Sequence, residues 1–317
     1  MDTEPVTPTD YDVAVLGGGT GGYSAALRAA QLGKRVALID RGERLGGTCL
    51  LRGCIPTKAL LRSAEVLDTV NRSATWGIEA SGSPDWSAIL AFQAKTVDKL
   101  VKGLEHLVAS RGIERIQAHG RLVTGPAIEA DGRVITAGDV VLALGSQPKT
   151  HPGIELGPRV VTSDEALTLG FIPGSVVVIG GGAIGLEFAS FYRSMGATVT
   201  LLETLPRIAA TEDEEISAQL VRAFRRRKIE VHVGAQVESV TPSSSGDAVI
   251  VTYAESEGES GGATVEAELC LVAVGRAPVS EDAGLEQAGV AIDRRLVKVN
   301  DDLTTTVPNV WEVRDAA

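Results

Sequence analysis

The feature that most constrains the fold of this chain is a pattern of apolar runs, glycines and an acid that occurs twice. In its first copy, the apolar run 11–16 leads into the motif Gly17-x-Gly19-x-x-Gly22. A helix rich in small residues is expected next, and a second apolar run then ends on Asp40. Short apolar runs on either side of a helical stretch indicate two buried strands joined by a helix.

The second copy begins near the middle of the chain. The apolar run 176–179 leads into Gly180-x-Gly182-x-x-Gly185, and the next apolar run ends on Glu203. The three glycines and the acid each lie 163 positions after their counterparts, as the steps from 17 to 180 and from 40 to 203 show. The sequence therefore predicts two βαβ units of one design.

Each motif has the spacing of a dinucleotide-binding loop. The first glycine permits a tight turn, the second lets a pyrophosphate approach the backbone, and the third lets the helix pack on the strand. The N-terminus of the following helix offers unpaired N–H groups to the phosphates. An acid at the end of the second strand can accept a hydrogen bond from a ribose 2′-hydroxyl, and it repels a 2′-phosphate. We therefore expect an α/β protein with two Rossmann-like dinucleotide-binding domains, and Glu203 favours NAD over NADP.

The rest of the chain contains further predicted elements. Segments 55–75 and 85–111 are expected to be helices, and short strands over 113–144 are expected to form a small antiparallel layer. A helix is expected over 212–227, and a buried strand over 269–274.

These elements predict three segments in two domains, with the second domain inserted into the first. Residues 1–152 are expected to form the first part of one dinucleotide-binding domain, and a proline-rich linker follows. Residues 153–280 are expected to form the second domain, and 281–317 to return to the first.

Composition argues against several classes of function. The net charge is −11 and aromatic residues make up only 4% of the chain, which disfavours binding to nucleic acid or anionic membranes. No apolar run approaches the roughly 20 residues that span a bilayer, and the polar segment 1–11 does not resemble a signal peptide. The basic cluster at 222–228 is interpreted as a solvated helix face. We expect a soluble, cytoplasmic protein.

Two of the three cysteines, Cys49 and Cys54, are close in sequence. Three cysteines in 317 residues do not make a secreted disulfide scaffold, and no second Cys or His pair completes a zinc site. The pair is therefore expected to be redox-active, with no metal bound; two buried free thiols are the alternative. A bridge requires Cα atoms within about 7 Å, so the segment between the cysteines must coil. Cys270, in an apolar strand, is expected to fill the core.

A helix is expected to begin close to Cys54, because Pro56 suits a first helical turn. The helix N-terminus would lower the pKa of Cys54 by favouring its thiolate. Lys58 lies one turn further along the same helix face, although an ordinary surface lysine is the alternative. Glu187 lies in an apolar stretch after the second glycine motif, where a carboxylate needs a partner. We therefore expect an ion pair between Lys58 and Glu187 across the domain interface.

The run 46–58, which contains both cysteines and ends in Ile-Pro-Thr-Lys, resembles the redox motif of the flavoprotein disulfide reductases. Within that family the chain is most similar to the dihydrolipoyl dehydrogenases, and the similarity covers essentially its whole length. The resemblance implies FAD on the first glycine motif and NAD on the second. The residues it places at FAD are Gly17, Gly19, Gly22, Asp40, Gly47, Thr48, Lys58, Gly120, Gly145 and Asp315. Those it places at NAD are Gly180, Gly182, Gly185, Glu203, Val237, Ala273, Gly275 and Arg276.

The resemblance also implies catalytic roles and a direction of electron flow. Cys49 would be the thiol that exchanges with lipoamide, and Cys54 the thiolate that lies against the flavin. Lys58 and Glu187 would form a buried pair near the flavin. Electrons would pass from dihydrolipoamide, carried by the lipoyl domain of a 2-oxoacid dehydrogenase complex, through the disulfide and FAD to NAD⁺.

The chain departs from the family pattern at its C-terminal end. Family members continue into an interface domain that supplies a catalytic His and Glu across a homodimer, whereas this sequence ends at Ala317. Arg314 stands where a glycine is usual before Asp315, and Leu144 where a threonine is usual before Gly145. A truncated, catalytically impaired nucleotide-binding remnant, monomeric for lack of the interface, is therefore the alternative expectation. Mercuric reductase needs a further C-terminal cysteine pair and glutathione reductase an NADP site, so both fit less well.

Overall fold

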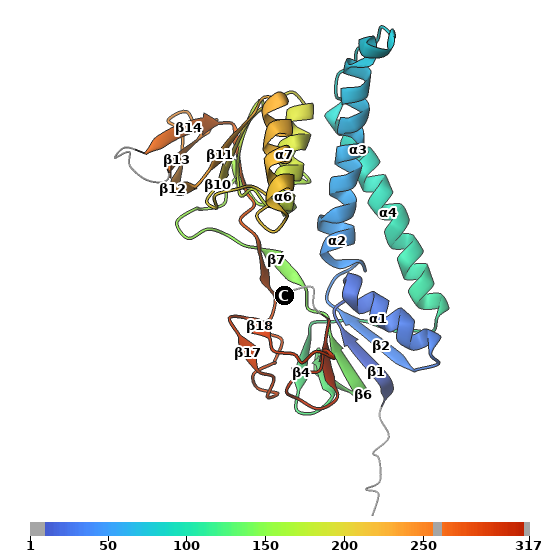
Figure 1. The fold of residues 1–317 in the computed structure, drawn as a ribbon. Helices are drawn as coiled ribbons and strands as arrows, with labels where there is room; N and C mark the ends of the chain where they lie inside the picture. The colour runs from blue at the N-terminus through green and yellow to red at the C-terminus, as the bar shows by residue number, and fades with distance from the viewer. Residues whose placement is uncertain (1–9, 256–261, 314–317) are drawn as a thin grey trace, which may run out of the picture. The chain divides into compact units, whose positions relative to one another are not determined.

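The computed structural model describes residues 10–255 and 262–313 (Figure 1). The chain divides into two compact units. Unit 1 comprises Met1–Cys54, Val97–Gln147 and Arg276–Ala317, and unit 2 comprises Ile55–Thr96 and Pro148–Gly275. Residues 55–96 thus belong to unit 2, whereas the boundaries drawn from the sequence place them in the first domain.

Unit 1 is built on a sheet whose central strands are parallel. Its strands are hydrogen-bonded in the order β3-β2-β1-β6-β5-β4, and β19 also pairs with β6. Strands β3, β2, β1, β6 and β19 are parallel, and β5 and β4 add an antiparallel edge. The bounds are β1 Tyr11–Leu16, β2 Val36–Asp40, β3 Glu114–Gln117, β4 Gly120–Val123, β5 Ala127–Ala130, β6 Arg133–Leu142 and β19 Val310–Glu312.

Helix α1 (Thr20–Gln31) joins β1 to β2, as the first glycine motif predicts. Ala26 of this helix packs in one apolar cluster with Val15 and Leu38. Leu16, the next residue of β1, belongs to a second apolar cluster. Successive residues of a strand point to opposite faces, so the two clusters bury both faces of the sheet. This is why β1 and β2 are continuous apolar runs in the sequence.

Unit 2 repeats the parallel design and adds an antiparallel sheet. Its parallel sheet has the order β11-β10-β9-β15-β8, and its antiparallel sheet the order β12-β13-β14. The parallel strands are β8 Val160–Val161, β9 Ser175–Ile179, β10 Thr198–Glu203, β11 Ile229–Val233 and β15 Leu269–Val272. The antiparallel strands are β12 Ala235–Pro242, β13 Val249–Glu255 and β14 Ala263–Ala267, and the helices are α5 Ser163–Ala166, α6 Ala183–Ser194 and α7 Glu214–Arg226.

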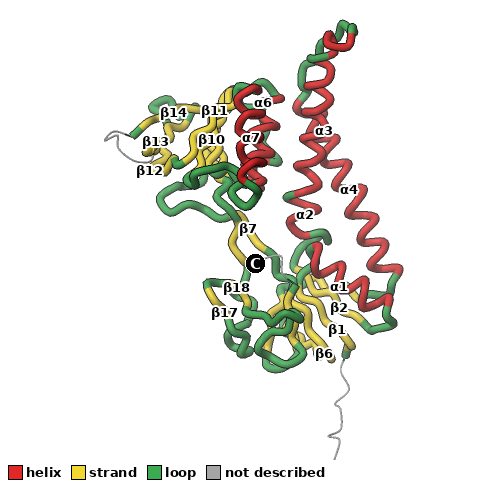
Figure 2. Tube along the Cα trace, in the orientation of Figure 1, coloured by secondary structure: helices red, strands yellow, loops and turns green. Residues whose placement is uncertain are grey.

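The helices predicted between the two repeats are confirmed. They are α3 Cys54–Asn71 and α4 Trp86–Ser110, which Figure 2 shows as long continuous helices, and a 3₁₀ turn η1 at Ser73–Trp76 follows α3. The remaining strands form two short ribbons, in which β7 (Ser146–Pro148) pairs with β16 (Arg276–Pro278) and β17 (Ile292–Asp293) with β18 (Leu296–Val297).

Packing explains why residues 55–96 belong to unit 2. Leu60 and Ala64 of α3 share an apolar cluster with Phe188 and Tyr192 of α6. The indole N–H of Trp86, at the start of α4, donates to the Leu169 carbonyl at 2.7 Å. These contacts join segments that are far apart in the sequence, so local patterns do not reveal them.

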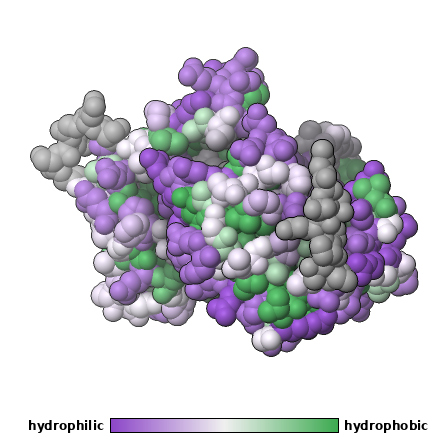
Figure 3. Space-filling model, turned by 90° about the horizontal axis from the view of Figure 1, so that it is seen from below, coloured by the Kyte–Doolittle hydropathy of each residue, from purple (hydrophilic) through white to green (hydrophobic). Residues whose placement is uncertain are grey.

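None of the helices in the described part of the chain is long and apolar enough to cross a membrane. The face drawn in Figure 3 mixes hydrophilic and hydrophobic side chains. The N-terminal segment 1–9 lies outside the described residues.

The glycine motifs make a testable prediction about stability. A Cβ at Gly22 would lie 1.8 Å from the Gly17 carbonyl oxygen, so Gly22→Ala forces the backbone apart. We expect this substitution to lower the free energy of unfolding by about 3 kcal/mol, as measured by urea denaturation followed by circular dichroism. Gly103 in α4 has open space around it, and Gly103→Ala is expected to raise the free energy of unfolding by about 0.5–1 kcal/mol. Similar effects of the two substitutions would contradict this account.

Candidate cofactor and disulfide sites

The first glycine loop is held by backbone-to-backbone contact. A Cβ at Gly17, whose φ is +113°, would lie 2.1 Å from the Ala143 carbonyl oxygen, and Gly22 packs against Gly17 itself. Gly19 differs, because a Cβ there would meet only the Gly47 Cα, at 3.7 Å. Two glycines are therefore required by packing, and the middle one leaves backbone that a bound group can approach. This is the cradle that a pyrophosphate needs, and FAD fits it.

The second glycine loop has the same arrangement. A Cβ at Gly180, whose φ is +110°, would lie 2.3 Å from the Ala273 carbonyl oxygen, and one at Gly185 would lie 1.9 Å from the Gly180 carbonyl oxygen. Around Gly182 there is no atom within 4 Å of an added Cβ. The repeat in the sequence is thus a repeat in three dimensions, and a second dinucleotide fits here.

The acid at the end of each second strand bonds to its own glycine loop. Asp40 accepts one hydrogen bond from the Gly18 N–H at 2.6 Å and another from the amide two residues further along the chain at 2.8 Å. Glu203 accepts from the Gly181 N–H at 2.5 Å and again from the amide two residues further along at 2.7 Å. Such bonds fix the position of each carboxylate beside its loop. The sequence predicted a ribose-binding acid; the structure adds that the acid also holds the loop.

A cavity of about 230 Å³ lies beside the first loop within unit 1. Gly17, Asp40, Gly120 and Leu144 line it. Gly120 was expected to approach FAD, and the structure gives a further reason for a glycine there, since a Cβ would lie 2.6 Å from a methyl group of Leu16. Gly145, which follows Leu144 in the chain, has a φ of +71°. Asp315 and Arg314, the other expected residues of this region, lie outside the described residues.

The two neighbouring cysteines lie at the junction of two helices. Helix α2 (Gly47–Arg52) carries Cys49, and α3 begins at Cys54, so the coiled segment and the helix start predicted from the sequence are confirmed. Both are free thiols; Cys49 is half-buried and Cys54 is exposed. Burial raises the pKa of Cys49, and the side-chain hydrogen bond with Cys54 and the charge of Cys54 raise it further. The two sulfur atoms are therefore close enough to interact directly.

The third cysteine has a different environment. Cys270 in β15 is fully buried, as predicted, and burial raises its pKa to about 12. A thiol with so high a pKa is inert near neutral pH. Among the described residues, no group of three or more His, Cys, Asp or Glu side chains could hold a metal ion.

Lys58 and Glu187 form the expected ion pair, with 2.7 Å between Nζ and Oε1. Two details of the prediction are wrong. The pair does not cross the boundary between the two units, because α3 packs on α6 and both residues belong to unit 2. The pair is not buried either: both side chains project from helix surfaces, and they are 58% and 33% exposed, respectively.

Outside the glycine loop, the residues expected at NAD lie in different surroundings from one another. They are Val237 and residues 273–276. The Ala273 carbonyl packs on the second glycine loop, and Gly275 has a φ of +114°. Val237 is buried in an apolar cluster of unit 2. The Arg276 guanidinium donates to the Ser146 carbonyl at 2.6 Å and the Ser146 hydroxyl at 2.8 Å. The assignment of these residues to a nicotinamide pocket stays a prediction.

Two polar influences near the cysteines could not be predicted from the sequence. Arg276 also reaches the Thr48 hydroxyl, at 3.4 Å, and Thr48 directly precedes Cys49. The Thr20 hydroxyl lowers the pKa of Cys49 against the larger effect of burial. Thr20 occupies an unrestricted position of the glycine motif, so nothing in the motif marks it. Only the folded chain brings these side chains together.

The model of one protein family matches residues 11–317, and that family is described as pyridine nucleotide-disulphide oxidoreductase. The chain belongs to this family. The α/β fold with two dinucleotide-binding domains, as predicted from the sequence, is confirmed by this match and by the solved structures that the chain resembles.

Relatives and solved structures agree with the match. A dihydrolipoyl dehydrogenase of Bacillus subtilis (strain 168) is 38% identical over 323 residues, covering 97% of this chain and 67% of the relative. One of Acholeplasma laidlawii is 36% identical, covering 96% of this chain and 90% of the relative. The HOCl-induced flavoprotein disulfide reductase RclA from Escherichia coli has a TM-score of 0.82 and 27% identity, covering 96% of this chain and 66% of that one. The chain thus spans about two-thirds of the Bacillus and Escherichia proteins.

The coupling between the two thiols can be tested by titration. Because Cys54 raises the pKa of Cys49, Cys54→Ala removes that charge and should move the midpoint of Cys49 alkylation to lower pH. The measurement is the rate of iodoacetamide modification of the reduced chain against pH, with Cys49 identified by peptide mass spectrometry. Cys270→Ala serves as the matched control and should leave the midpoint unchanged. An unshifted midpoint in Cys54→Ala would show that the sulfur atoms do not interact.

Proposed function

We propose that this chain carries the electron path of an FAD- and NAD-dependent dihydrolipoyl dehydrogenase. The observation that carries the proposal is the position of the thiol pair beside the first glycine loop. The Gly46 N–H, next to the redox helix, donates to the Gly18 carbonyl at 2.9 Å, and both segments belong to unit 1. A nucleotide on this loop and a disulfide on α2 would therefore be neighbours. Family membership and the named relatives support the reaction type.

The first glycine loop is the proposed FAD site. Gly19 offers half-buried backbone just before α1, and Asp40 stands at the end of β2 where a ribose hydroxyl would lie. Gly47, the first residue of α2, packs against Gly19, and Thr48 follows it in the chain. Bound there, FAD would supply a two-electron acceptor between the disulfide and the nicotinamide.

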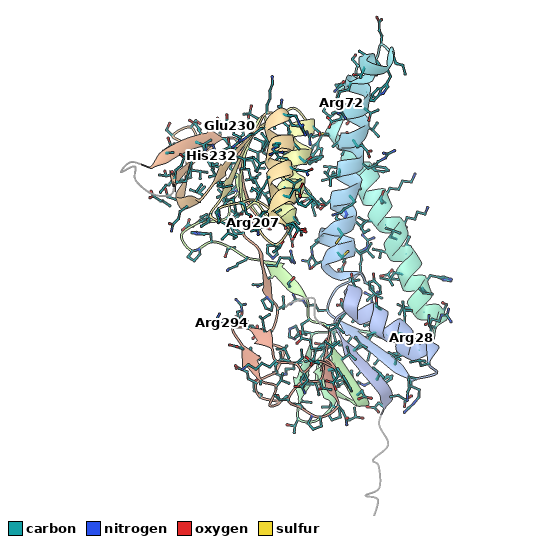
Figure 4. The ribbon with its side chains drawn as sticks, viewed as in Figure 1. Arg28, Arg72, Arg207, Glu230, His232 and Arg294 are labelled. Carbon is teal, nitrogen blue, oxygen red and sulfur yellow. The ribbon has the colours of Figure 1, made fainter. Side chains whose placement is uncertain are left out.

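The second glycine loop is the proposed NAD site. Glu203 beside this loop would accept a hydrogen bond from a ribose 2′-hydroxyl and repel a 2′-phosphate. Arg207, labelled in Figure 4, is the basic residue that follows in the chain. Its guanidinium donates to the Glu212 carbonyl at 2.6 Å and to the Ala210 carbonyl at 2.8 Å, so it is committed to its own loop. Both features favour NAD over NADP.

The thiol pair would exchange electrons with a dithiol substrate. A dihydrolipoamide thiolate attacks one sulfur of the Cys49–Cys54 disulfide, and its second thiol then closes the lipoamide ring. The protein S–S bond is broken and the lipoamide S–S bond is formed. Two electrons pass to the cysteines, which become thiolates, and the two substrate protons are released. We propose that Cys49 makes the mixed disulfide and that Cys54 faces the flavin. Lys58, one turn after Cys54 and paired with Glu187, would supply a positive charge near a reduced cofactor.

The partner and location follow from the same proposal. A dihydrolipoamide substrate implies the lipoyl domain of a 2-oxoacid dehydrogenase complex as partner, as the relatives' name suggests by analogy. We also propose a cytoplasmic location. The acidic surface, with a net charge of −11, is unsuited to nucleic acid.

Spectroscopy tests the proposed function. Chain reconstituted with FAD should retain a flavin spectrum after gel filtration, and dithiol reduction should produce a long-wavelength charge-transfer band. Cys54→Ala should keep the flavin and lose the band, because the thiolate donor is gone. Cys270→Ala removes a buried thiol that does not react near neutral pH, so this variant is expected to keep both the flavin and the band. A chain that retains no flavin, or a band that survives Cys54→Ala, would overturn the proposal.

Nucleotide preference tests the role of Glu203. Glu203→Arg replaces the repelling charge with an attractive one, and the ratio of kcat/KM for NADPH over NADH should rise by at least about tenfold. The measurement is reduction of an artificial dye acceptor by the FAD-loaded chain. Glu230→Arg makes the same charge change on β11 (Figure 4) and should leave the ratio unchanged. If both variants shift the ratio equally, the effect is one of net charge and not of the loop.

A further inference from the structure

The segment 42–46, which follows Asp40 in the chain, is bonded on one side to the first glycine loop and its acid. The Gly42 N–H donates to the Asp40 carboxylate at 2.8 Å, and the Gly46 N–H donates to the Gly18 carbonyl at 2.9 Å. The carboxylate itself accepts from the N–H of Gly18 at 2.6 Å. The direction of the Asp40 carboxylate therefore depends on where this segment lies.

An ion pair from two other elements of unit 1 holds the same segment on its other side. Nη2 of Arg115, on β3, donates to the Gly42 carbonyl at 2.9 Å and to the Glu43 carbonyl at 2.6 Å. Its Nη1 donates to Glu105, on α4, at 3.1 Å, and the same Glu105 oxygen accepts from the Leu45 N–H at 3.3 Å. The side chains of Arg115 and Glu105 are 24% and 33% exposed, so solvent screens this pair less than a fully exposed one.

One nitrogen of Arg115 indicates that the side chain is placed for the segment and not for the ion pair alone. Its Nε is buried, and no hydrogen-bond partner for it lies among the residues that the structure describes. A buried donor without a partner is unfavourable. An arginine that only paired with Glu105 could keep this N–H in water. The buried position is the one from which the guanidinium reaches two backbone carbonyls.

The second unit holds the corresponding segment from within. The spacing of 163 continues past the acids, from 42 to 205 and from 46 to 209. The Leu205 N–H donates to Glu203 at 2.7 Å, and the Ala209 N–H donates to the Gly181 carbonyl at 2.8 Å, as their counterparts do in the first unit. Arg207, which lies inside this segment, donates to two carbonyls further along the chain. Both units thus support the segment with a guanidinium, and in the first unit it comes from a different strand.

We propose that Arg115 is a positioning residue for the FAD site, which together with Glu105 holds segment 42–46 so that the Asp40 carboxylate faces the adenosine ribose. The role in FAD binding rests on the proposed function, whereas the contacts exist in the cofactor-free chain. Each oxygen of the carboxylate already accepts one backbone N–H, and each keeps a lone pair for a ribose hydroxyl. Without Arg115 two carbonyls of the segment lose their donor, the carboxylate is no longer held in one direction, and its bond to the hydroxyl weakens.

The experiment compares FAD with an FAD analogue that lacks the 2′-hydroxyl of the adenosine, and it measures both dissociation constants by equilibrium dialysis. In the original chain the analogue should bind about tenfold more weakly, because Asp40 has no hydroxyl from which to accept. In Arg115→Gln, FAD should bind about tenfold more weakly while the analogue binds almost as before, so the ratio of the two constants should fall close to one. A variant that only destabilised the fold would weaken both ligands equally and keep the ratio.

Hydrogen–deuterium exchange of backbone amides tests the contacts without any cofactor. In cofactor-free Arg115→Gln, the amides of 42–46 should exchange at least about tenfold faster, and those of β2 should keep their original rates. Arg121→Gln is the matched control, because it breaks an ion pair of similar length with Glu129 elsewhere in unit 1. It should change neither the amide exchange of the segment nor the ratio of dissociation constants.

A second variant keeps the test decisive. Arg115→Lys retains the charge but lacks the planar fork that bridges two carbonyls and a carboxylate, and it replaces Arg115→Gln should the latter fail to fold by circular dichroism. A folded variant that keeps the tenfold ratio, or that keeps the original amide exchange over 42–46, would overturn the proposal. An original chain that binds no FAD would overturn the proposed function instead. Amide exchange would then still decide whether Arg115 holds the segment.

Discussion

The contact on which both candidate sites depend is the close approach of a glycine loop to the neighbouring strand end. Gly17 lies against the Ala143 carbonyl and Gly180 against the Ala273 carbonyl, at separations that no side chain could occupy. The third glycine of each motif then packs on the first, so the helix must begin at this point. Its first N–H groups are left facing outward, where they can bind phosphate oxygens. Without these contacts, neither loop would present a helix N-terminus to a ligand.

The carboxylates of Asp40 and Glu203 complete each loop from the other side. Each carboxylate accepts two backbone N–H groups, and bonds of this kind are stronger than those between neutral partners. The glycine loop and its carboxylate are therefore arranged in the same way in both units, and the two sites differ in the side chains around them. A cysteine pair adjoins the first loop, whereas Glu187 on the helix after the second loop pairs with Lys58. One design thus supports two unlike sites.

Much of this could be predicted from the sequence where the cause is local. The glycine spacing fixes the two loops, and the apolar runs fix strands buried on both faces. Glu187, a carboxylate in an apolar stretch of the sequence, does have a cationic partner. What could not be predicted depends on long-range packing. The grouping of residues 55–96 with unit 2 follows from the packing of Leu60 with Phe188. Lys58 is exposed because it lies on the outer surface of α3. The packing of α2 on the first glycine loop likewise follows from a backbone contact between two helix starts, at Gly19 and Gly47.

The surroundings of Cys49 act on the charge of its sulfur in opposite directions. Burial and the neighbouring Cys54 both disfavour that charge and raise the pKa of Cys49. The Thr20 hydroxyl and the Cys54 amide lower the pKa, but they do not outweigh burial. The fold therefore places a thiol with a raised pKa beside the loop proposed to bind FAD, which the Gly46 N–H joins through its bond to the Gly18 carbonyl.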